Sequence, residues 1–390
     1  MKDKLKYMLK LLLRLVLKVF WLFPIKKYTI FFMANMGKNF LCNPKYLYMS
    51  MINDDRYSNY TFIWCFKNTK NVDRSAFTQE TKLVDKRNVF LYFYRLLTSE
   101  AIIYNCGGFS YAPIRKKQLL IETWHGGGAF KRVGLSIPGK SKASKKGITL
   151  ASRDIKLFLS TSQISSELVI KQSLDYHGEI LNSGFPRNDI LFHSNDGLVY
   201  NIKEKMGIQA DTHIVLYAPT FKGSEDKAVN TYSEVEMINA QLIKKSLHDR
   251  FGGEWVFWSR GHQYTKDIDI PGSDLDITSY PDMQELLIIS DVLISDYSSS
   301  IWDYAITKKP CFLFVPDIEK YKNEERGFLT PIEKWPGVLC INNDDINKSI
   351  QQFDYQQYYD HIQSYFDTVK SYEEGNACQK TLNRILEKIK

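Results

Sequence analysis

A histidine followed by three glycines is the first feature of this sequence that could do chemistry. Trp124, His125 and Gly126–Gly128 come directly after an apolar run, Leu119–Thr123, that predicts a buried strand. Glycine has no Cβ, so the backbone can turn sharply there and a substrate can approach the imidazole. The ordinary pKa of histidine, about 6.5, suits a general base at neutral pH. Taken alone, His125 is equally well explained as a structural histidine.

Basic residues follow in the same loop. Lys131 and Arg132 are succeeded by four more lysines, and no acid interrupts Lys131–Lys146. Such a run is usually a solvated loop, and the alternative is a site for a phosphate-bearing acceptor. We assign to the acceptor side the following residues: Gly126, Gly127, Gly128, Lys131 and Arg132.

The strongest local signal is a run of three serines, Ser298–Ser300. The serines follow a predicted buried strand, which ends at Asp296, and they open a predicted helix. Hydroxyls and free backbone N–H groups at a helix N-terminus bind phosphate. Ordinary capping explains one serine and leaves the others, so the pattern favours a phosphate site.

Two more predicted strands end in groups suited to an anion. Thr220 precedes Lys222 and Gly223, which is typical of an anion-binding turn. Arg260 and His262 follow another strand, and both can donate hydrogen bonds to a diphosphate. No GxxxxGK[ST] or GxGxxG pattern is present, so nucleotide sites of those two types are not supported.

The loop Ser183–Asp189 is less informative. Arg187 is its one candidate for contact with an anion, and we group it with the phosphate-binding residues. The alternative is an ordinary turn in which Asp189 caps a helix.

From Tyr28 onward, short apolar runs alternate with helical patterns, which predicts βα units around mostly parallel sheets. The predicted strands are Tyr28–Ala34, Thr61–Phe66, Ala101–Asn105, Leu119–Thr123, Lys156–Ser160, Glu179–Ser183, His213–Ala218, Glu254–Trp258, Asp291–Ser295 and Pro310–Val315. We expect an N-terminal, acceptor-side Rossmann-like lobe at 28–190 and a C-terminal lobe at 191–354, with a central cleft. A helical segment, 355–390, is expected to pack across both lobes.

Composition excludes several classes. Of 390 residues, 44% are apolar and 25% charged, which rules out a disordered or collagen-like chain. The net charge is +8, but residues 1–27 hold eight of the 52 Lys and Arg and one of the 44 acids, so a nucleic-acid-binding surface spread over the fold is not expected. Six scattered cysteines without a CxxC pair favour a reducing compartment over a zinc site or disulfides.

Residues 1–27 predict an amphipathic helix on a membrane surface. Cations recur at every fourth position, at Lys6, Lys10, Arg14 and Lys18. They break the segment into stretches too short for a membrane span or a signal peptide. We expect the cations to face anionic headgroups, with Trp21 and Phe23 at the boundary, and the helix to stop at Pro24. The alternative is a surface helix packed on the protein's own core.

Six ordered motifs now carry a resemblance. The sequence resembles the CDP-glycerol glycerophosphotransferase family of teichoic acid primases and polymerases in WHGGGAFKRVG, SGFPRND, YAPTFKG, RGH, ISDYSSSIWDYAITKKPCFLFVPD and ERGF. The likeness extends from about Asn35 to Phe328. It implies an α/β fold of GT-B type, two Rossmann-like lobes preceded by the membrane-surface helix, with CDP held mainly by the C-terminal lobe.

The resemblance also implies transfer of a polyol phosphate from CDP-glycerol or CDP-ribitol to a hydroxyl of a lipid-linked saccharide or polyol-phosphate acceptor, with release of CMP. It places the base at His125 and diphosphate contacts at Thr220, Arg260, His262, Ser298, Ser299 and Ser300, and we count both histidines as catalytic. Asp296 shares the serine motif. The expected location is peripheral, on the cytoplasmic face of a bacterial membrane.

Two points stay open in this assignment. Gly127 and Gly128 stand where family members that build teichoic acid often have Thr-Pro, so the acceptor or the polyol can differ. No acid cluster with metal spacing accompanies the motifs, so we expect no tightly bound metal or cofactor, and a loosely held Mg²⁺ remains open. The alternatives are a GT-B glycosyltransferase using a nucleotide sugar and a non-catalytic membrane-associated scaffold.

Overall fold

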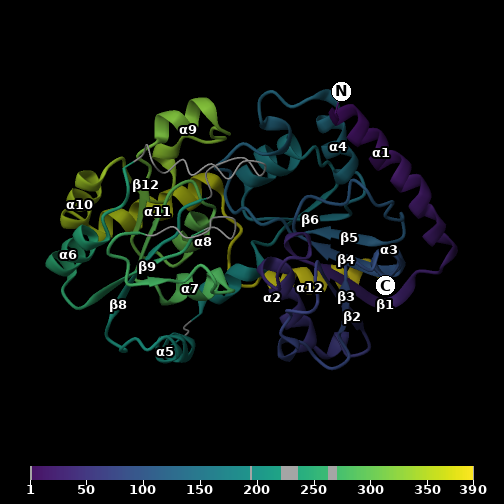
Figure 1. Ribbon diagram of the computed structural model, residues 1–390, viewed down its shortest axis with the longest axis horizontal. Coiled ribbons are helices and arrows are strands. Elements are labelled where there is room, and N and C mark those ends of the chain that lie inside the picture. Colours follow the sequence, from purple (N-terminus) through teal and green to yellow (C-terminus); the bar gives the residue numbers. More distant parts are fainter. Residues whose placement is uncertain (1, 194–195, 221–235, 262–269, 390) are drawn as a thin grey trace. The chain divides into compact units, whose positions relative to one another are not determined.

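The computed structural model describes residues 2–193, 196–220, 236–261 and 270–389, which fold into two compact units (Figure 1). The first unit comprises Met1–Gly126, Arg132–Asp189 and Ser371–Lys390. The second comprises Gly127–Lys131 and Ile190–Lys370. Five residues of the loop that contains His125, Gly127–Lys131, therefore belong to the second unit. The residues on both sides of them belong to the first unit.

The first unit is built on a parallel sheet of seven strands in the order β3-β2-β1-β4-β5-β6-β7. The strands are β1 (Lys26–Met33), β2 (Thr61–Phe66), β3 (Lys82–Asp85), β4 (Ser99–Tyr104), β5 (Leu119–Glu122), β6 (Leu157–Ser160) and β7 (Glu179–Asn182). The longer helices are α1 (Lys2–Leu17), α2 (Cys42–Ile52), α3 (Val89–Thr98), α4 (Lys142–Ser152), a π-helix (Ser165–Ser173) and α12 (Ala377–Lys388). Short 3-10 turns complete it at Lys18–Leu22, Asn35–Gly37, Asp55–Tyr57, Arg74–Ala76 and Gly134–Ser136, and the 3-10 turn Pro186–Phe192 begins in this unit and ends in the second.

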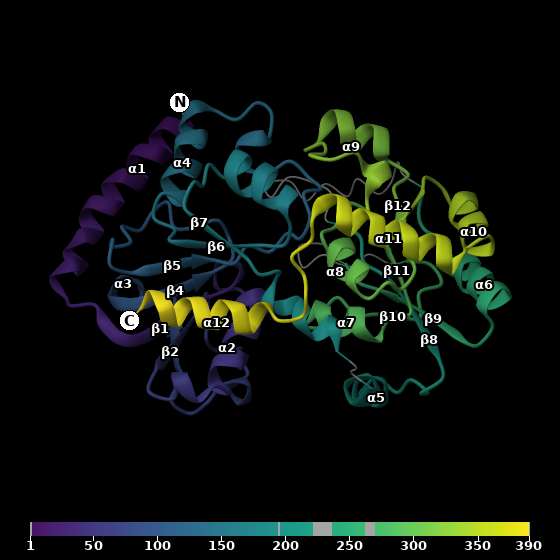
Figure 2. The same ribbon diagram turned by 180° about the vertical axis from the view of Figure 1, so that it is seen from behind.

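Helices cover both faces of this sheet because its strands are apolar on both sides. Ile30 and Phe32 of β1 pack in one cluster with residues of α2 and α12 (Figure 2). Phe31, between them, packs toward Tyr92 of α3, with the ring centroids 6.2 Å apart. Successive side chains of a strand point to opposite faces, so this alternation places the two helical layers.

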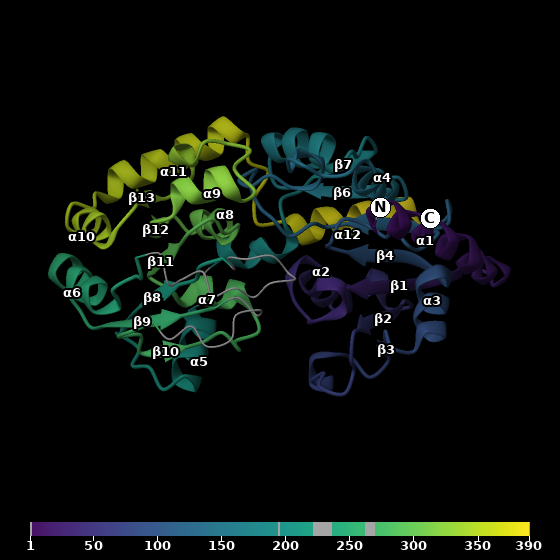
Figure 3. The same ribbon diagram turned by 45° about the horizontal axis from the view of Figure 1, so that its top comes forward.

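The second unit is built on six parallel strands in the order β10-β9-β8-β11-β12-β13. They are β8 (His213–Tyr217), β9 (Trp255–Ser259), β10 (Leu275–Asp276), β11 (Val292–Ser295), β12 (Cys311–Phe314) and β13 (Val338–Cys340). The helices are α5 (Asp196–Lys205), α6 (Ala240–Phe251), α7 (Met283–Ile289), α8 (Ser300–Ile306), α9 (Ile318–Glu324), α10 (Asn343–Gln351) and α11 (Tyr355–Val369), with a 3-10 turn at Ile332–Lys334. Helices α6, α10 and α11 lie together beside this sheet (Figure 3).

Each of the ten predicted strands is present, with ends within two residues of those expected. Three short strands were missed: β3, β10 and β13, all at or beside sheet edges. The C-terminal segment is two helices rather than one. Lys370 adopts a left-handed conformation (φ 51°) that ends α11, which belongs to the second unit, and α12 then belongs to the first.

Candidate active site

Each sheet has one position at which its strand order reverses. In the first sheet this position lies between β1 and β4, and in the second between β8 and β11. Ligands of such sheets bind beyond the carboxyl ends of the strands at that point. The residues that follow these four strands are Asn35 and Asn105 in the first unit and Thr220 and Asp296 in the second.

His125 follows β5, and its exposed imidazole is oriented by the loop after β4. Its Nδ1 lies 2.7 Å from the carbonyl oxygen of Asn105, a distance at which the ring N–H donates to that oxygen. A proton fixed on Nδ1 makes Nε2 the basic nitrogen. This tautomer is the one that a general base at His125 requires.

The backbone around His125 is held in uncommon conformations. Trp124 has a φ of 53°, and Asn35, Met36 and Cys42 also have positive φ values. Such conformations cost energy in residues other than glycine and persist only where the surroundings impose them. Here the side chain of Asn43 donates to the carbonyl oxygens of Thr123 (2.9 Å) and Trp124 (3.0 Å).

Asn35 and Asn105 are cross-linked to each other. The backbone N–H of Asn35 donates to Oδ1 of Asn105 at 2.9 Å, and Nδ2 of Asn105 donates back to Oδ1 of Asn35 at 3.2 Å. The two loops at the switch point are thereby fixed relative to each other. Asn105 was not predicted as a site residue, although a polar residue that ends a buried strand just before two glycines was the available signal.

Glu122 is a second organising residue that the sequence prediction missed. Its carboxyl group is fully buried, and its oxygens accept backbone hydrogen bonds from Trp124 (2.9 Å), Gly107 (2.8 Å) and Gly108 (2.8 Å). It therefore ties the loop after β4 to the residue before His125. Burial raises the pKa of Glu122 to about 8, against the opposing effect of these N–H donors. An acid inside an otherwise apolar strand was the signal for it.

The pKa of Glu122 predicts a pH-dependent stability. Because the folded-state pKa (about 8) is above the ordinary value of 4.5, the folded state binds the proton more tightly than the unfolded state. The contribution of this group to the unfolding free energy is then largest below pH 4.5 and falls as the pH rises toward 8, by at most about 1.4 kcal/mol per pH unit. Urea unfolding at several pH values should show this fall in the wild type and a flatter profile in Glu122→Gln.

A control of opposite sign is available. Arg384 lowers the pKa of Glu179, so Glu179→Gln should remove stability that is present at high pH. Profiles of the Glu122→Gln variant and the wild type that run parallel over this pH range would contradict a protonated carboxyl at Glu122.

Arg187 lies in the first unit, with His125 rather than with the other predicted phosphate contacts. Its guanidinium is buried, and Nη1 donates to the carbonyl oxygen of His125 at 2.9 Å and contacts the sulfur of Cys42 at 3.1 Å. In this arrangement Arg187 holds the histidine loop. The neighbouring Asp189 does cap a helix, but a distant one: it accepts from the backbone N–H groups of Ala377 and Cys378 at the start of α12.

Asp296 and Thr220 form the switch point of the second unit. The buried Asp296 carboxylate accepts from the backbone N–H of Thr220 at 2.8 Å and from its hydroxyl at 3.0 Å. It also accepts from the backbone N–H of Tyr297. Asp296 thus sets the orientation of Thr220, a role that the sequence left undefined.

The three serines are used in a way that the sequence did not show. Helix α8 begins at Ser300, and Ser298 Oγ accepts from the backbone N–H of Ser300 at 3.2 Å and from its hydroxyl at 2.9 Å. Two of the three predicted phosphate contacts therefore interact with each other in the cap. Ser298 and Ser299 remain partly exposed, whereas Ser300 is buried.

Arg260 follows β9 and is directed toward the start of α7. Its Nη2 donates to the carbonyl oxygen of Tyr280 at 3.0 Å, and its Nη1 contacts the sulfur of Met283. Burial lowers the pKa of this guanidinium. The predicted residues Lys222, Gly223 and His262 lie outside the described residues.

The predicted acceptor-side group is divided by the structure. Gly126 and Arg132 belong to the first unit, whereas Gly127, Gly128 and Lys131 belong to the second. Lys131 bridges Phe328 in antiparallel fashion, and burial lowers its pKa to about 8 although nearby Asp296 acts in the opposite direction. Lys131 thus lies with the predicted donor residues.

Packing explains the two glycines that depart from the family pattern. A Cβ on Gly127 would lie 2.3 Å from Cδ1 of Trp302, a fully buried residue of α8. Gly128 has a φ of +67°, and its Cβ would lie 2.9 Å from Phe130 Cζ. These positions accept only glycine because the loop lies directly against a tryptophan of the same unit.

We therefore expect Gly127→Ala to destabilise the second unit. Overpacking of this kind costs about 1–3 kcal/mol, which thermal unfolding would detect as a lower Tm. Gly126→Ala is the matched control, because its Cβ would meet nothing closer than 3.4 Å. An unchanged Tm in Gly127→Ala would show that Trp302 does not pack as described.

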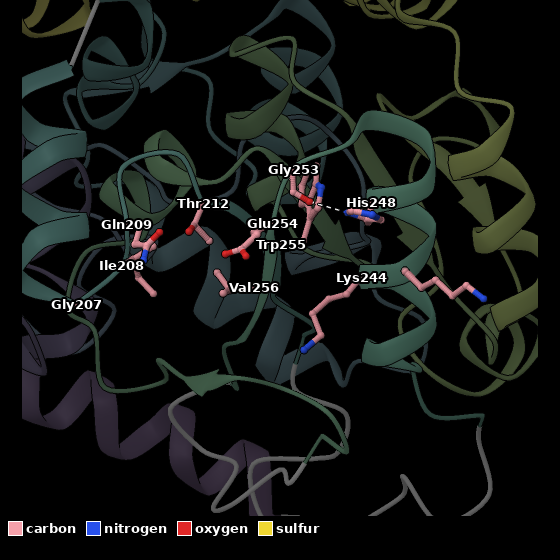
Figure 4. Close-up of a pocket in the computed structure, with 11 residues that line it drawn as sticks. Gly207, Ile208, Gln209, Thr212, Lys244, His248, Gly253, Glu254, Trp255 and Val256 are labelled. Carbon is pink, nitrogen blue, oxygen red and sulfur yellow. Dashed lines mark hydrogen bonds between the residues drawn. The ribbon is translucent and has the colours of Figure 1, made fainter.

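A cavity in the second unit lies apart from these residues. It has a volume of about 530 Å³, opens at the amino ends of β8 and β9, the end of the sheet away from Thr220, and is lined by Lys244, His248 and Glu254 among others (Figure 4). Within the described ranges, no three His, Cys, Asp or Glu side chains are grouped to hold a metal ion.

Two Rossmann-like units, each with polar residues at its switch point, define a GT-B-like α/β fold. The family can be stated directly: residues 15–387 match the family CDP-Glycerol:Poly(glycerophosphate) glycerophosphotransferase, and the chain belongs to it. The predicted family and the predicted enzyme class are thereby confirmed.

Individual relatives agree. The chain is 29% identical to a teichoic acid poly(glycerol phosphate) polymerase of Staphylococcus epidermidis. The matched region covers 91% of this chain but only 50% of that polymerase. It is 27% identical to a polymerase of the same name from Bacillus spizizenii, covering 95% of both chains. The solved structure of the wall teichoic acid polymerase TagF is 28% identical with a TM-score of 0.79, over 100% of this chain and 97% of that one. The predicted GT-B-like α/β fold is confirmed by this similarity and by the two parallel sheets.

Proposed function

We propose that this chain transfers glycerol phosphate from CDP-glycerol to a hydroxyl of a lipid-linked acceptor, in the synthesis of teichoic acid or a related cell-surface polymer. The observation that carries the proposal is the exposed imidazole of His125, whose Nδ1 donates to the carbonyl oxygen of Asn105 at the switch point of the first unit. With the ring proton on Nδ1, Nε2 is the basic nitrogen of the imidazole. Membership of the glycerophosphotransferase family supplies the donor class.

In the proposed reaction, Nε2 of His125 takes the proton of the acceptor hydroxyl while the oxygen of that hydroxyl attacks the β-phosphorus of the donor. The new bond joins the acceptor oxygen to phosphorus, and the bond from phosphorus to the bridging oxygen breaks. The electron pair stays on that oxygen, which leaves as CMP. Donors fixed in place stabilise such developing charge. We assign this role to Thr220, Arg260 and the partly exposed serines Ser298 and Ser299, and, on the family resemblance alone, to His262.

A donor panel tests the proposal. The purified chain should consume CDP-glycerol, or CDP-ribitol if the polyol differs, only in the presence of acceptor, and it should leave UDP-sugars intact. Consumption of a UDP-sugar instead would favour the glycosyltransferase alternative. No consumption of any donor would favour the scaffold. Parallel reactions with EDTA and with added Mg²⁺ test the proposal that no metal is tightly bound.

We further propose that the chain attaches peripherally to a membrane through α1. Its outward face is apolar: Leu5, Leu9, Leu12 and Val16 are each more than half exposed. The apolar surface continues to Leu22 and, beside it, to Val89 and Phe90 of α3. None of the described helices is long and apolar enough to cross a bilayer. An apolar helical face left open to solvent is typical of interfacial binding.

One part of the sequence prediction is wrong here. Arg14 does not face outward toward lipid: it is buried, pairs with Asp154, and donates to the carbonyl oxygens of Phe109 and Ala112. Together with buried Leu17 and Phe20, it fastens the helix to the first unit. Deletion of the helix would therefore damage the fold, and substitutions on the outward face are the better test.

We expect Leu9→Gln combined with Leu12→Gln to weaken binding to vesicles by about 10²–10⁴-fold, since each buried leucine contributes about 1.5–3 kcal/mol. Sedimentation with anionic and with neutral vesicles measures this. Tyr200→Gln with Ile341→Gln removes two exposed apolar side chains from the second unit and should have no effect. Equal binding by both double variants would contradict attachment through α1.

A further inference from the structure

A cavity of about 500 Å³ lies within the first unit, between α1 and α4, which run side by side (Figure 1). It opens beyond the carboxyl ends of β4 and β5. The residues that matter most in its lining are Lys6, Lys10, Lys86, Tyr111, Cys106 and Trp124. Lys6 and Lys10 come from α1, where Lys6 is exposed and Lys10 half-buried, and Lys86 follows β3.

The cavity gathers more positive than negative charge, with three lysines and one acid in its lining. Asp3 is the one acid in the lining, and its carboxylate accepts a hydrogen bond from the Ser141 hydroxyl at 2.6 Å. In the part of the chain that the structure describes, no carboxylate is paired with Lys6, Lys10 or Lys86. Three lysines grouped in a concavity repel one another, so an anion bound among them would be stabilised.

Lys86 is held in place by aromatic rings. Its ammonium lies 5.5 Å from the ring centroid of Tyr92 and 5.9 Å from that of Tyr111. Lys86 is half-buried, and this burial lowers its pKa. An ammonium that is fixed and partly desolvated binds a phosphate oxygen more strongly than a mobile surface lysine does.

The position of the cavity indicates which anion it serves. Two residues of its lining, Cys106 and Trp124, are chain neighbours of the site residues. Cys106 follows Asn105, and Trp124 precedes His125, whose imidazole Asn105 orients. The outward face of the same α1 helix is the apolar surface that we assign to lipid. A molecule with a lipid chain, a phosphate and a reacting hydroxyl matches this order of apolar face, lysines and base.

We propose that this cavity binds the phosphate that joins the acceptor to its lipid. The inference rests on the proposed function, because it assumes an acceptor that is lipid-linked. It assigns to Lys6, Lys10 and Lys86 the recognition of the acceptor, separate from the donor contacts of the second unit.

Two variants test the cavity: Lys6→Gln with Lys10→Gln, and Lys86→Met, which keeps the aliphatic stem between the tyrosines. Each should raise the KM for acceptor about 10-fold or more, as expected for the loss of a charged hydrogen bond, with the KM for CDP-glycerol unchanged. The matched control is Lys18→Gln with Lys26→Gln, which removes two charges from the same terminal segment outside the cavity. The control should leave the acceptor KM unchanged.

The outcomes separate the explanations. Equal KM changes in the cavity and control variants would show that charge acts only through the membrane surface, and no change in the folded cavity variants would overturn the inference. Isothermal titration with a short-chain alkyl diphosphate and with inorganic pyrophosphate requires no turnover. The wild type should bind the alkyl diphosphate, and the Lys86→Met variant should bind it about 10-fold more weakly. Equal affinity for both probes would assign the cavity to free phosphates instead of a lipid phosphate. If CDP-glycerol is not consumed, the proposed function fails while this titration still decides the cavity.

Discussion

Replacing His125 by alanine should lower turnover by about 10²–10⁴-fold and leave the affinity for CDP nearly unchanged, the effect usual for loss of a general base. The reason is the hydrogen bond from Nδ1 to Asn105, which commits Nε2 to accepting a proton. Initial rates with saturating donor, together with direct titration of CDP, separate the two quantities. This is the largest effect that we expect from a single side chain.

His177→Ala is the control for that experiment. His177 is an exposed histidine of the same unit, and its Nε2 lies 3.2 Å from Asp175. Its replacement should leave turnover unchanged. If His125→Ala works at nearly the wild-type rate with the natural acceptor, the base lies elsewhere in the chain.

Replacing Asp296 by alanine should reduce kcat/KM for the donor by about 10²–10³-fold, the cost of misplacing a donor group that stabilises the transition state. The carboxylate accepts both the N–H and the hydroxyl hydrogen bonds of Thr220, so its loss frees the turn after β8. The KM for acceptor should change little. Steady-state kinetics with each substrate varied in turn measures the difference.

Loss of stability alone must be separated from this effect. Asp303 on α8 is also buried and accepts a hydrogen bond from Gln284 at 3.0 Å. Asp303→Ala should lower Tm in the same way as Asp296→Ala without the selective loss for the donor. Equal donor kinetics in the two variants would mean that Asp296 acts only through the fold.

The local sequence pattern predicted all interior strands and the edge strand β7, but it did not predict the edge strands β3, β10 and β13. The ten predicted strands are mostly apolar runs, whereas β3 (Lys82–Asp85) begins and ends with a charged residue and β10 (Leu275–Asp276) has only two residues. Edge strands bury less surface, so their sequences show little periodicity. Both switch points follow from the strand order, which a sequence without an alignment does not reveal.

The residues of the candidate site also fall into two groups, those that the sequence pattern predicted and those that it did not. His125 and Thr220 could be found because they follow apolar strands, but their partners depend on contacts between distant parts of the chain. Asn105 is 20 residues from His125, and Asp296 is 76 residues from Thr220. The amphipathic character of residues 1–27 was predicted from the sequence. The direction in which the apolar side of α1 faces depends on the contact between Arg14 and Asp154, 140 residues apart.

The nucleotide released from CDP-glycerol tests the central claim most directly. Attack on the β-phosphorus must release CMP and add one glycerol phosphate to the acceptor for each CMP formed. Attack on carbon would release CDP and add no phosphorus. Chromatography of the nucleotides, combined with the mass of the acceptor product, distinguishes the two. We expect CMP and phosphorylated product in equal amounts, and release of CDP would contradict glycerophosphate transfer by this chain.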